Sequence, residues 1–493
     1  MSEFQVVQAE EVMMALRTAE QYYDSLRQMS PAAYVLGEKV ADITTHPLTK
    51  GQVAAVAQTY ALSHNPEGRQ LLVAYSDLVG EEVSRFTKLY ESTDDLLTKV
   101  KMLKFLSQRT GTCYMRCTGM DALNAAGVTT YEVDAKHGTK YRQRFLEYLK
   151  YVQQNDLVVW SGVTDVKGDR SLRPSAQPDP DMYLRIVDRN NDGIIVRGAK
   201  AHQSGSLCAN EGLIIPSREM REDDKDYAVC FALPADTEGI IHVYGRGTLE
   251  LREIEGIDLG NVDFGKFCPM VIFNDVFVPW ERVFLCGEYE FAGPMVRTFG
   301  SYHRHSHGGC KCGVGDVIIG AAATIAEYNG VPNVSHINAK LVEMIKTIET
   351  MYGCCLAASI EARPSDSGIY LVDSVLANTS KLYEGQEYHE VLRLLVDIAG
   401  GFVADLPSEK DLQNPEIGHF IEKYLKGAAD VPIEDRMRMF RLIEKLAFET
   451  RDIVSNIHGG GSPEAHRMTL LRDTDLEPKK KMARRLAGIK EKK

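Results

Sequence analysis

The sequence predicts an α+β fold in which a central β domain separates two helical regions. Residues 18–153 carry apolar side chains at helical spacing, and residues 154–290 carry short strand-forming runs bounded by turn residues. Residues 291–493 return to long amphipathic stretches and end in a basic tail, and residues 1–17 form an N-terminal extension. A chain of 493 residues exceeds what one compact core usually holds, so two or three domains are expected.

The first helical region is predicted to begin at Thr18, because Glu20 and Gln21 in the following turn favour a helix start. Apolar residues repeat at helical spacing over residues 81–106 and again over residues 145–152. We therefore expect helix from residue 18 to about residue 150.

From about residue 155 the sequence changes from helical spacing to short strand-like runs. Residues 157–160 form a short apolar run, and residues 183–197 read as a strand, the turn Asn-Asn-Asp-Gly and a second strand. Further strands are expected at residues 227–233, 239–244 and 271–278.

Helices are expected again beyond residue 290. Residues 314–328 are apolar and small, as in a tightly packed buried helix, and residues 339–362 and 436–458 are long and amphipathic. The basic stretch at residues 479–493 fits a solvated helix end or a contact with an anionic ligand or neighbouring molecule.

Composition narrows the class of protein. Apolar residues make up 44% and charged residues 26%, which is ordinary for a soluble enzyme, and a net charge of −12 argues against nucleic acid as a partner. An unbroken apolar run near ~18 residues, which a membrane span needs, is not seen. The acidic residues Glu3, Glu10 and Glu11 do not fit a secretory signal, so we expect a cytoplasmic protein whose ten cysteines are mostly reduced.

Two separate stretches supply metal-ligand residue types. Cys113 and Cys117 stand four residues apart, which would place both thiols on one face of a helix, although for this spacing alone simple packing is the better explanation. Residues 301–313 hold three histidines and two cysteines around Gly308 and Gly309, glycines that would let the backbone approach a bulky group. A surface histidine cluster is the plain alternative. If the stretches meet, zinc and an iron–sulfur cluster fit these residue types equally.

Three further stretches offer contacts for a flavin. The loop at residues 164–171 can cradle a diphosphate or ribityl chain, and a charged hairpin turn is the plain alternative. The polar strand end at residues 202–204 can tune flavin electronics or is an ordinary polar strand end. The end of a helical segment near residue 400 fits a plain helix C-cap or a close approach to a dinucleotide. The candidates are Asp165, Lys167, Gly168, Asp169, Arg170, His202, Gln203, Ser204, Asp397, Ala399, Gly400 and Gly401. Without a GxGxxG fingerprint, no Rossmann domain is expected.

Several of these stretches together resemble a known family. They are residues 92–96 (STDDL), 148–152 (YLKYV), 167–170 (KGDR), 196–203 (VRGAKAHQ), 291–293 (FAG) and 458–463 (HGGGSP). The chain resembles the 4-hydroxybutyryl-CoA dehydratase family from residue 18 to residue 490. That family is related to the acyl-CoA dehydrogenases and to the flavin-dependent 4-hydroxyphenylacetate hydroxylases.

The resemblance implies an acyl-CoA dehydrogenase-like fold, a homotetramer, FAD and a [4Fe–4S] cluster. The implied cluster ligands are Cys113, Cys117, His303 and Cys310, and the implied flavin contacts are the three stretches above. The hydroxylases lack these cluster cysteines, which favours a dehydratase over an oxygenase. The implied activity is an oxygen-sensitive dehydration or double-bond isomerisation of a 4-hydroxyacyl-CoA, with one-electron flavin chemistry and iron as Lewis acid.

The chain departs from the family where the chemistry is most sensitive. A family tyrosine is replaced by His307 and two family glutamates by Cys268 and Ser455, while Lys311 is retained. His307 is the candidate proton carrier, His303 can serve as ligand or base, and Cys268 and Ser455 are poor substitutes for carboxylates. A different hydroxylated substrate, a reduced-flavin phenol monooxygenase and a non-catalytic relative that keeps the cluster for structure are therefore the alternatives.

Overall fold

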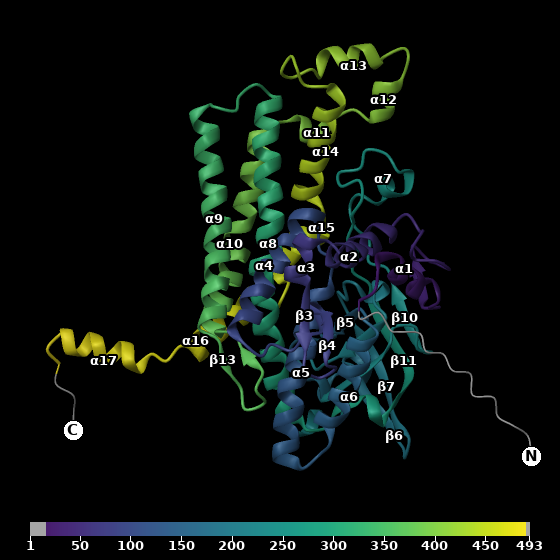
Figure 1. Ribbon diagram of the computed structural model, residues 1–493, viewed down its shortest axis with the longest axis vertical. Helices are drawn as coiled ribbons and strands as arrows, with labels where there is room; N and C mark the ends of the chain where they lie inside the picture. The colour runs from purple at the N-terminus through teal and green to yellow at the C-terminus, as the bar shows by residue number, and fades with distance from the viewer. Residues whose placement is uncertain (1–15, 490–493) are drawn as a thin grey trace, which may run out of the picture.

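The computed structural model describes residues 16–489 and shows the expected mixture of helices and sheets (Figure 1). A helical bundle runs along the upper part of the molecule in this view, and two β-sheets lie beside its lower half. The acidic residues near the N-terminus and residues 490–493 of the basic tail lie outside the described residues.

The predicted helix start at Thr18 is confirmed. Thr18 caps helix α1 (Ala19–Arg27): its hydroxyl accepts from the Gln21 backbone N–H, and the Gln21 side chain accepts from the Thr18 N–H. The helices that follow are α2 (Lys50–Ser63), α3 (Pro66–Leu72), α4 (Thr93–Thr110), α5 (Arg116–His137) and α6 (Tyr141–Gln154).

The expectation of an entirely helical region up to residue 150 is wrong at two places. Strand β1 (Ala32–Val35) pairs in parallel with β10 (Ile240–Val243) of the central region and carries β2 (Glu38–Lys39) beside it. Strands β3 (Val73–Ser76) and β4 (Glu81–Ser84) form a hairpin, and β4 occupies the start of the stretch whose spacing predicted a helix. These segments form strands because their backbones pair with distant or neighbouring strands, and the local spacing of apolar residues does not indicate such pairing.

The predicted strand–turn–strand is confirmed as β6 (Arg185–Arg189) and β7 (Gly193–Lys200), which pair antiparallel. The remaining strands are β5 (Val159–Gly162), β8 (Glu211–Ile214), β9 (Val229–Pro234), β11 (Met270–Pro279) and β12 (Val283–Cys286), with a short helix α7 (Glu250–Glu255) after β10. They form one sheet in the order β2-β1-β10-β11-β7-β6 and another in the order β12-β9-β8-β5. Phe231 and Phe273 meet edge-to-face between these sheets with ring centroids 6.0 Å apart.

The C-terminal bundle is built around the 37-residue helix α8 (Ala292–Tyr328). Helices α9 (Ser335–Ile360), α10 (Ser374–Ala399) and α14 (Ile433–Phe448) pack on it, as does α4 from the N-terminal region. A small hairpin, β13 (Arg363–Pro364) and β14 (Tyr370–Leu371), joins α9 to α10.

Gly308 and Gly309 serve helix packing, which corrects the expectation that they admit a bulky group. A Cβ at Gly309 would lie 2.6 Å from the Val100 carbonyl oxygen of α4, and a Cβ at Gly308 would lie 2.1 Å from the sulfur of Cys355 on α9. The two glycines therefore let α8 approach both neighbouring helices closely.

The predicted helix over residues 436–458 is two helices, α14 and α15 (Thr450–His458), separated by Glu449. The buried Glu449 carboxylate bonds the Lys445 and Arg451 side chains and accepts from the Arg451 backbone N–H. The new helix packs on α10, and its Ser455 accepts a hydrogen bond from Lys311 of α8.

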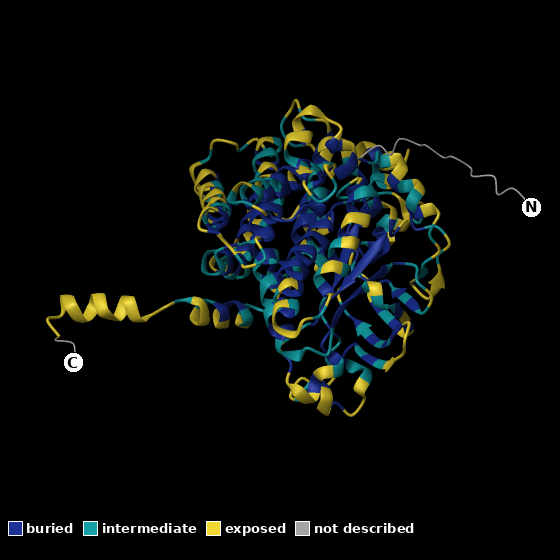
Figure 2. Cartoon of the chain, turned by 60° about the horizontal axis from the view of Figure 1, so that its bottom comes forward, coloured by how far each residue is buried: buried dark blue, intermediate teal, exposed yellow. Residues whose placement is uncertain are grey.

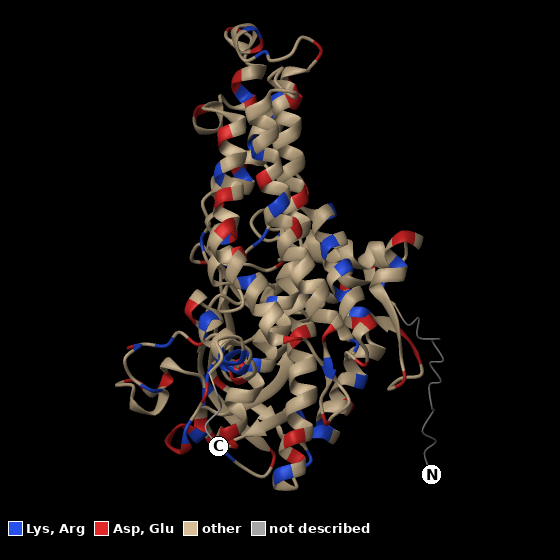
Figure 3. Cartoon of the chain, turned by 90° about the vertical axis from the view of Figure 1, so that its left-hand side faces the viewer, with Lys and Arg blue, Asp and Glu red and all other residues tan. Residues whose placement is uncertain are grey.

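The last part of the chain extends away from the bundle. Helices α11 (Phe402–Asp405), α12 (Glu409–Gln413) and α13 (Gly418–Tyr424) cap its far end, and α16 (Pro463–Asp473) leads to α17 (Glu477–Leu486). Helix α17 is exposed along its whole length and stands apart from the body (Figure 2). Basic and acidic residues alternate along the helices and loops in the view of Figure 3.

One helical stretch among the described residues, at positions 289–328, is long and apolar enough to cross a membrane. Of its most apolar window, 61% is buried inside the fold, which is typical of the central helix of a bundle. The stretch contains α8, on which the other helices pack.

A buried histidine in the larger sheet predicts a pH dependence of stability. Burial lowers the pKa of His242 to about 4, and both ring nitrogens are bonded, to Ser206 Oγ at 3.0 Å and to the Ala235 carbonyl oxygen at 2.8 Å. Between pH 6.5 and 4 the unfolded chain binds a proton that the folded chain does not, so stability falls as the pH falls through this window.

We expect this histidine to account for roughly 3 kcal/mol of unfolding free energy between these limits. Chemical denaturation at a series of pH values checks it, with His242→Gln expected to show a shallower dependence. A variant whose unfolding free energy falls as steeply as that of the parent chain would contradict the assignment.

Candidate functional site

The residues that were expected to carry chemistry on α8 divide between two of its faces. His303, His307 and Cys310 follow one another at steps of four and three residues, so they share a face. His305 and Cys312 lie on another face: His305 bonds Ser359 at 2.8 Å and Cys312 bonds the Ile348 carbonyl oxygen at 3.4 Å, both on α9. The predicted ligands His303 and Cys310 therefore lie on a different face of α8 from His305 and Cys312, which contact α9.

Cys113 and Cys117 do meet, but not as neighbours on one helix. Cys113 lies in the loop between α4 and α5, where Met115 has a φ of 63°, and Cys117 lies in the first turn of α5. The turn brings the two thiols into hydrogen-bonding contact. The bond from Cys117 lowers the pKa of Cys113 to about 6 against the effect of burial, with Lys266 and Lys311 adding to the lowering. Cys113 is therefore a thiolate near neutral pH, the form that binds metals.

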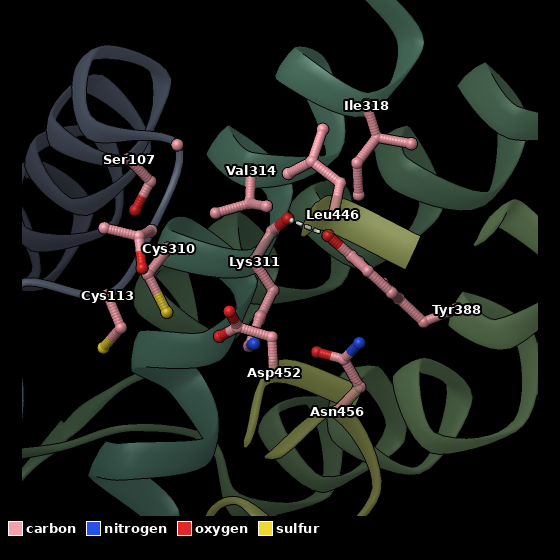
Figure 4. A pocket seen from close by; sticks show the side chains of 12 residues that line it. Ser107, Cys113, Cys310, Lys311, Val314, Ile318, Tyr388, Leu446, Asp452 and Asn456 are labelled. Atoms are coloured by element: carbon pink, nitrogen blue, oxygen red, sulfur yellow. Dashed lines mark hydrogen bonds between the residues drawn. The ribbon is translucent and has the colours of Figure 1, made fainter. Parts of the chain in front are cut away.

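A small cavity lies between Cys113 and Cys310 (Figure 4). Its wall includes Ser107 and Thr112, whose buried hydroxyl oxygens have no hydrogen-bond partner among the described residues. Cys113, Cys310 and the two hydroxyls border the cavity, Cys117 contacts Cys113, and His303 shares a face of α8 with Cys310. Three thiols, one imidazole and hydroxyls able to donate to sulfide are donor types that fit an iron–sulfur cluster. Within residues 16–489, three or more such side chains do not converge closely enough to enclose a single ion. A cluster of several irons and sulfides is larger than an ion and needs ligands spaced around it.

Asp121 orients His303. The Nδ1–H of His303 donates to one oxygen of Asp121 at 3.0 Å, and Lys99 donates to the other at 2.7 Å. Ser306 and Tyr90 also donate to this buried carboxylate. Burial alone would raise the pKa of Asp121, but Lys99 and His303 lower it to about 2. The bond to Nδ1 leaves Nε2 as the ring nitrogen available to a metal.

The expected proton carrier, His307, belongs to a second buried network. Its Nδ1 contacts both oxygens of Glu384, at 3.1 and 3.0 Å, and Lys381 lies 3.3 Å from the same carboxylate. Burial lowers the pKa of His307 to about 3, so the imidazole is neutral and donates its Nδ1–H to Glu384. A Cβ at Gly459 would lie 2.6 Å from His307 Cε1, so the glycine-rich turn after α15 closes over this ring.

The remaining catalytic candidates form a polar group beside the cavity. Lys311 donates to Ser455 Oγ at 2.9 Å, and Lys266 donates to the same oxygen at 3.2 Å and to Asp452 at 3.1 Å. Cys268 lies 2.6 Å from Ser204 Oγ, which connects this group to the strand end that was expected to contact flavin.

The flavin candidates do not all lie together. His202 has a φ of 58°. Its pKa is lowered by burial and then by the nearby charges of Lys167 and His458. The strand end at residues 202–204, the loop at residues 164–171 and the glycine-rich turn after α15 are therefore neighbours. Asp165 is held in a buried ion pair with Lys200 at 2.9 Å, and Asp169 caps Ser171. Lys167 and Gly168 adopt positive φ angles in the tight turn that leads to Arg170, and Gln203 is buried.

Residues 397–401 lie elsewhere. Asp397 pairs with Lys340 at 2.8 Å and is thirteen residues along α10 from Glu384, about 20 Å at the rise of a helix. Ala399 ends α10, and Gly400 and Gly401 follow it with open space around their Cα atoms. The structure therefore does not bring this segment to the cavity of the same chain.

The sequence analysis missed six charged residues of the site: Lys99, Asp121, Lys266, Lys381, Glu384 and Asp452. One signal was present, because Asp121 stands four residues after Cys117 in an otherwise apolar and small stretch. The others come from segments whose neighbours in space are not evident from local spacing.

Comparison with known proteins decides the family. Two family models, the N-terminal and C-terminal parts of 4-hydroxyphenylacetate 3-hydroxylase, match residues 18–285 and 292–488. The chain is 46% identical over 489 residues to the 4-hydroxybutyryl-CoA dehydratase/vinylacetyl-CoA Δ-isomerase of Clostridium aminobutyricum, covering 96% of this chain and 100% of that protein. The chain belongs to the 4-hydroxybutyryl-CoA dehydratase family. The predicted resemblance, and with it an enzyme of the hydro-lyase type with isomerase activity, is confirmed.

Solved structures give the same relationship. The 4-hydroxybutyryl-CoA dehydratase of the archaeon N. maritimus, described as oxygen tolerant, is 44% identical and superimposes with a TM-score of 0.95 over 97% of this chain and 96% of its own. The oxygenase component of 4-hydroxyphenylacetate 3-monooxygenase complexed with FAD is 27% identical, with a TM-score of 0.84 over 95% and 98% of the two chains.

Proposed function

We propose that this chain is an FAD- and [4Fe–4S]-dependent dehydratase of a 4-hydroxybutyryl-CoA-like substrate, with isomerase activity on the corresponding unsaturated thioester. The observation that carries the proposal is the cavity between Cys113 and Cys310, with Cys117 and His303 nearby and the polar group of Lys311 on its wall. The support for flavin is the FAD bound by the 27% identical oxygenase component and the neighbouring positions of Lys167 and His202.

In this proposal Cys113, Cys117, Cys310 and the Nε2 of His303 hold the cluster. When bound, flavin and cluster supply one-electron oxidation and a Lewis-acidic iron. Asp121 holds the His303 ring in the tautomer that leaves Nε2 free. His307, whose Nδ1–H donates to Glu384, is the proposed proton carrier, and its Nε2 is the unprotonated ring nitrogen.

The proposal includes the acyl-CoA dehydrogenase-like arrangement of three domains, with boundaries at residues 18–153, 154–290 and 291–493. It also includes a homotetramer, a cytoplasmic location and an oxygen-sensitive cluster. In such an assembly residues 397–401, which do not reach the cavity of their own chain, would serve the flavin of a neighbouring copy.

A reduced-flavin monooxygenase is the second candidate, because the chain is also 30% identical over 429 residues to a 4-hydroxyphenylacetate 3-monooxygenase oxygenase component of Thermus thermophilus. The observation against it is the gathering of the cysteines at positions 113, 117 and 310, which an oxygenase of this type does not need.

The test is an anaerobic preparation in which FAD, iron and turnover are measured together. We expect bound FAD, about four irons per chain from one [4Fe–4S] cluster, and conversion of 4-hydroxybutyryl-CoA to butenoyl-CoA and water. Butyryl-CoA, which lacks the hydroxyl group, is the unreactive control. Loaded protein that converts neither 4-hydroxybutyryl-CoA nor vinylacetyl-CoA would overturn the proposal, and hydroxylation of a phenol with reduced flavin and oxygen would establish the alternative.

A further inference from the structure

Helix α15 carries three polar side chains on the face that borders the cavity. Ser455 and Asn456 follow Asp452 by three and four residues, so all three share one face of the helix. Asp452 and Asn456 line the cavity that Cys113 and Cys310 border, and Figure 4 shows the Asp452 carboxylate beside the end of the Lys311 side chain. This face of α15 and the predicted cluster ligands therefore border the same space.

The two lysines of this group differ in how completely their donors are used. Lys266 makes three hydrogen bonds, to Asp452 Oδ1 at 3.1 Å, Ser455 Oγ at 3.2 Å and the Arg451 carbonyl oxygen at 3.3 Å. An ammonium has three N–H donors, so Lys266 is saturated and fixes one oxygen of Asp452. Lys311 is equally buried but makes a single side-chain bond among the described residues, to Ser455. Two of its donors remain for a ligand.

Two oxygen atoms beside Lys311 are also hydrogen-bond acceptors without a partner among the described residues. Of the hydrogen bonds among residues 16–489, none reaches Asp452 Oδ2, and the buried Asn456 Oδ1 has no partner. Burial would raise the pKa of Asp452, but Lys266 and Lys311 lower it to about 2, so the carboxylate stays ionised and accepts hydrogen bonds. A free cationic donor next to a free anionic acceptor matches a hydroxyl group, whose oxygen accepts from the first while its hydrogen is donated to the second.

We propose that Asp452 is the carboxylate that binds the hydroxyl group of the substrate. The inference rests on the proposed function, since it concerns the hydroxyl that a dehydratase removes. At two positions where the family resemblance implies glutamates, this chain has Cys268 and Ser455. One turn earlier on α15, Asp452 returns a carboxylate to the same face, and Lys266 holds it in place. Asp452 Oδ2 accepts the hydroxyl hydrogen and Lys311 donates to the hydroxyl oxygen.

The simpler role for Asp452 is a counter-ion that only neutralises Lys266. Both roles predict that substitution disturbs the buried lysine, so stability and activity do not separate them. They differ in one respect: a counter-ion does not distinguish a hydroxylated acyl-CoA from the same acyl-CoA without its hydroxyl group.

The experiment measures dissociation constants of 4-hydroxybutyryl-CoA and butyryl-CoA by anaerobic calorimetry on protein loaded with FAD and iron. For Asp452→Asn we expect 4-hydroxybutyryl-CoA to bind roughly 10- to 100-fold more weakly, the effect of losing a hydrogen bond to a charged group, with butyryl-CoA unchanged. Glu444→Gln is the matched control, because Glu444 pairs with Arg252 and Arg441 away from the cavity. It is expected to bind both ligands as the parent chain does.

A double variant, Asp452→Ser with Ser455→Glu, moves the carboxylate back by one turn and keeps the charge balance around Lys266. It is expected to recover the preference for the hydroxylated ligand, and it tests the inference if Asp452→Asn does not load its cofactors. Equal weakening of both ligands, or no weakening in Asp452→Asn, would overturn the inference while leaving the proposed function intact. A parent chain that binds neither ligand would overturn the proposed function and the inference with it.

Discussion

Replacing Cys310 by alanine is expected to abolish cluster binding without unfolding the chain. Cys310 lies on the face of α8 that borders the cavity, across from Cys113, and its thiol makes no hydrogen bond within the described residues that the fold would lose. Iron is expected to fall from about four per chain to near zero, together with the broad visible absorbance of the cluster. Circular dichroism is expected to stay unchanged, since a small buried side chain is replaced by a smaller one.

Cys312→Ala is the matched control, because Cys312 lies two residues further on the same helix and its thiol bonds the Ile348 carbonyl oxygen of α9. It is expected to keep its iron. Cys310→Ala protein with the iron content of the parent chain would refute the ligand assignment, and equal loss in both variants would show that packing of α8, not ligation, is responsible.

Asp121→Asn is expected to lower both stability and iron content. Asp121 pairs with Lys99 at 2.7 Å in the interior, and breaking a buried ion pair costs about 3–5 kcal/mol. The amide cannot accept from His303 and Lys99 as the carboxylate does, so the His303 ring loses the partner that sets its tautomer. Urea denaturation measures the first effect, and iron analysis of anaerobically loaded protein measures the second.

Lys99→Met separates these effects. It breaks the same ion pair, so a comparable loss of stability is expected, but Asp121 still accepts from His303 at Nδ1. Iron content should therefore stay close to that of the parent chain. If both variants lose iron to the same extent, the lower stability explains the loss of iron, and the inference that Asp121 orients His303 is wrong.

Helical spacing predicts one face of this site and no more. His303, His307 and Cys310 share a face of α8 because they recur at its period, and the long apolar segments around them identify a buried bundle. Cys113 shows the limit: four residues from Cys117, it was expected on the same helix but lies in the turn before it. The thiols still meet because the backbone turns at Met115, and no local pattern reports that turn.

The charged partners were missed for a different reason. Glu384 and Lys381 come from α10, and Asp452 from α15, so each reaches the cavity through the docking of a separate helix. On sequence alone a charged residue of an amphipathic helix is assigned to solvent. The strands β1 to β4 were missed in the same way, since they are defined by pairing partners and β1 finds its partner about 200 residues further along the chain.

Ser455 and Cys268, the residues at the positions where the resemblance implies glutamates, both make specific contacts. Ser455 is the shared acceptor of Lys266 and Lys311, and Cys268 contacts Ser204 at the strand end near His202. Asp452, one turn before Ser455 on α15, is the carboxylate that Lys266 contacts directly.

In the proposed enzyme, three sulfurs and one imidazole from separate parts of the chain surround one iron–sulfur cluster. Anomalous diffraction at the iron absorption edge, from crystals grown without oxygen, locates the iron. We expect a compact group of iron peaks in the cavity bordered by Cys113 and Cys310, within bonding distance of both, of Cys117 and of His303. Iron bound elsewhere, or a single zinc ion on any of these side chains, would contradict it.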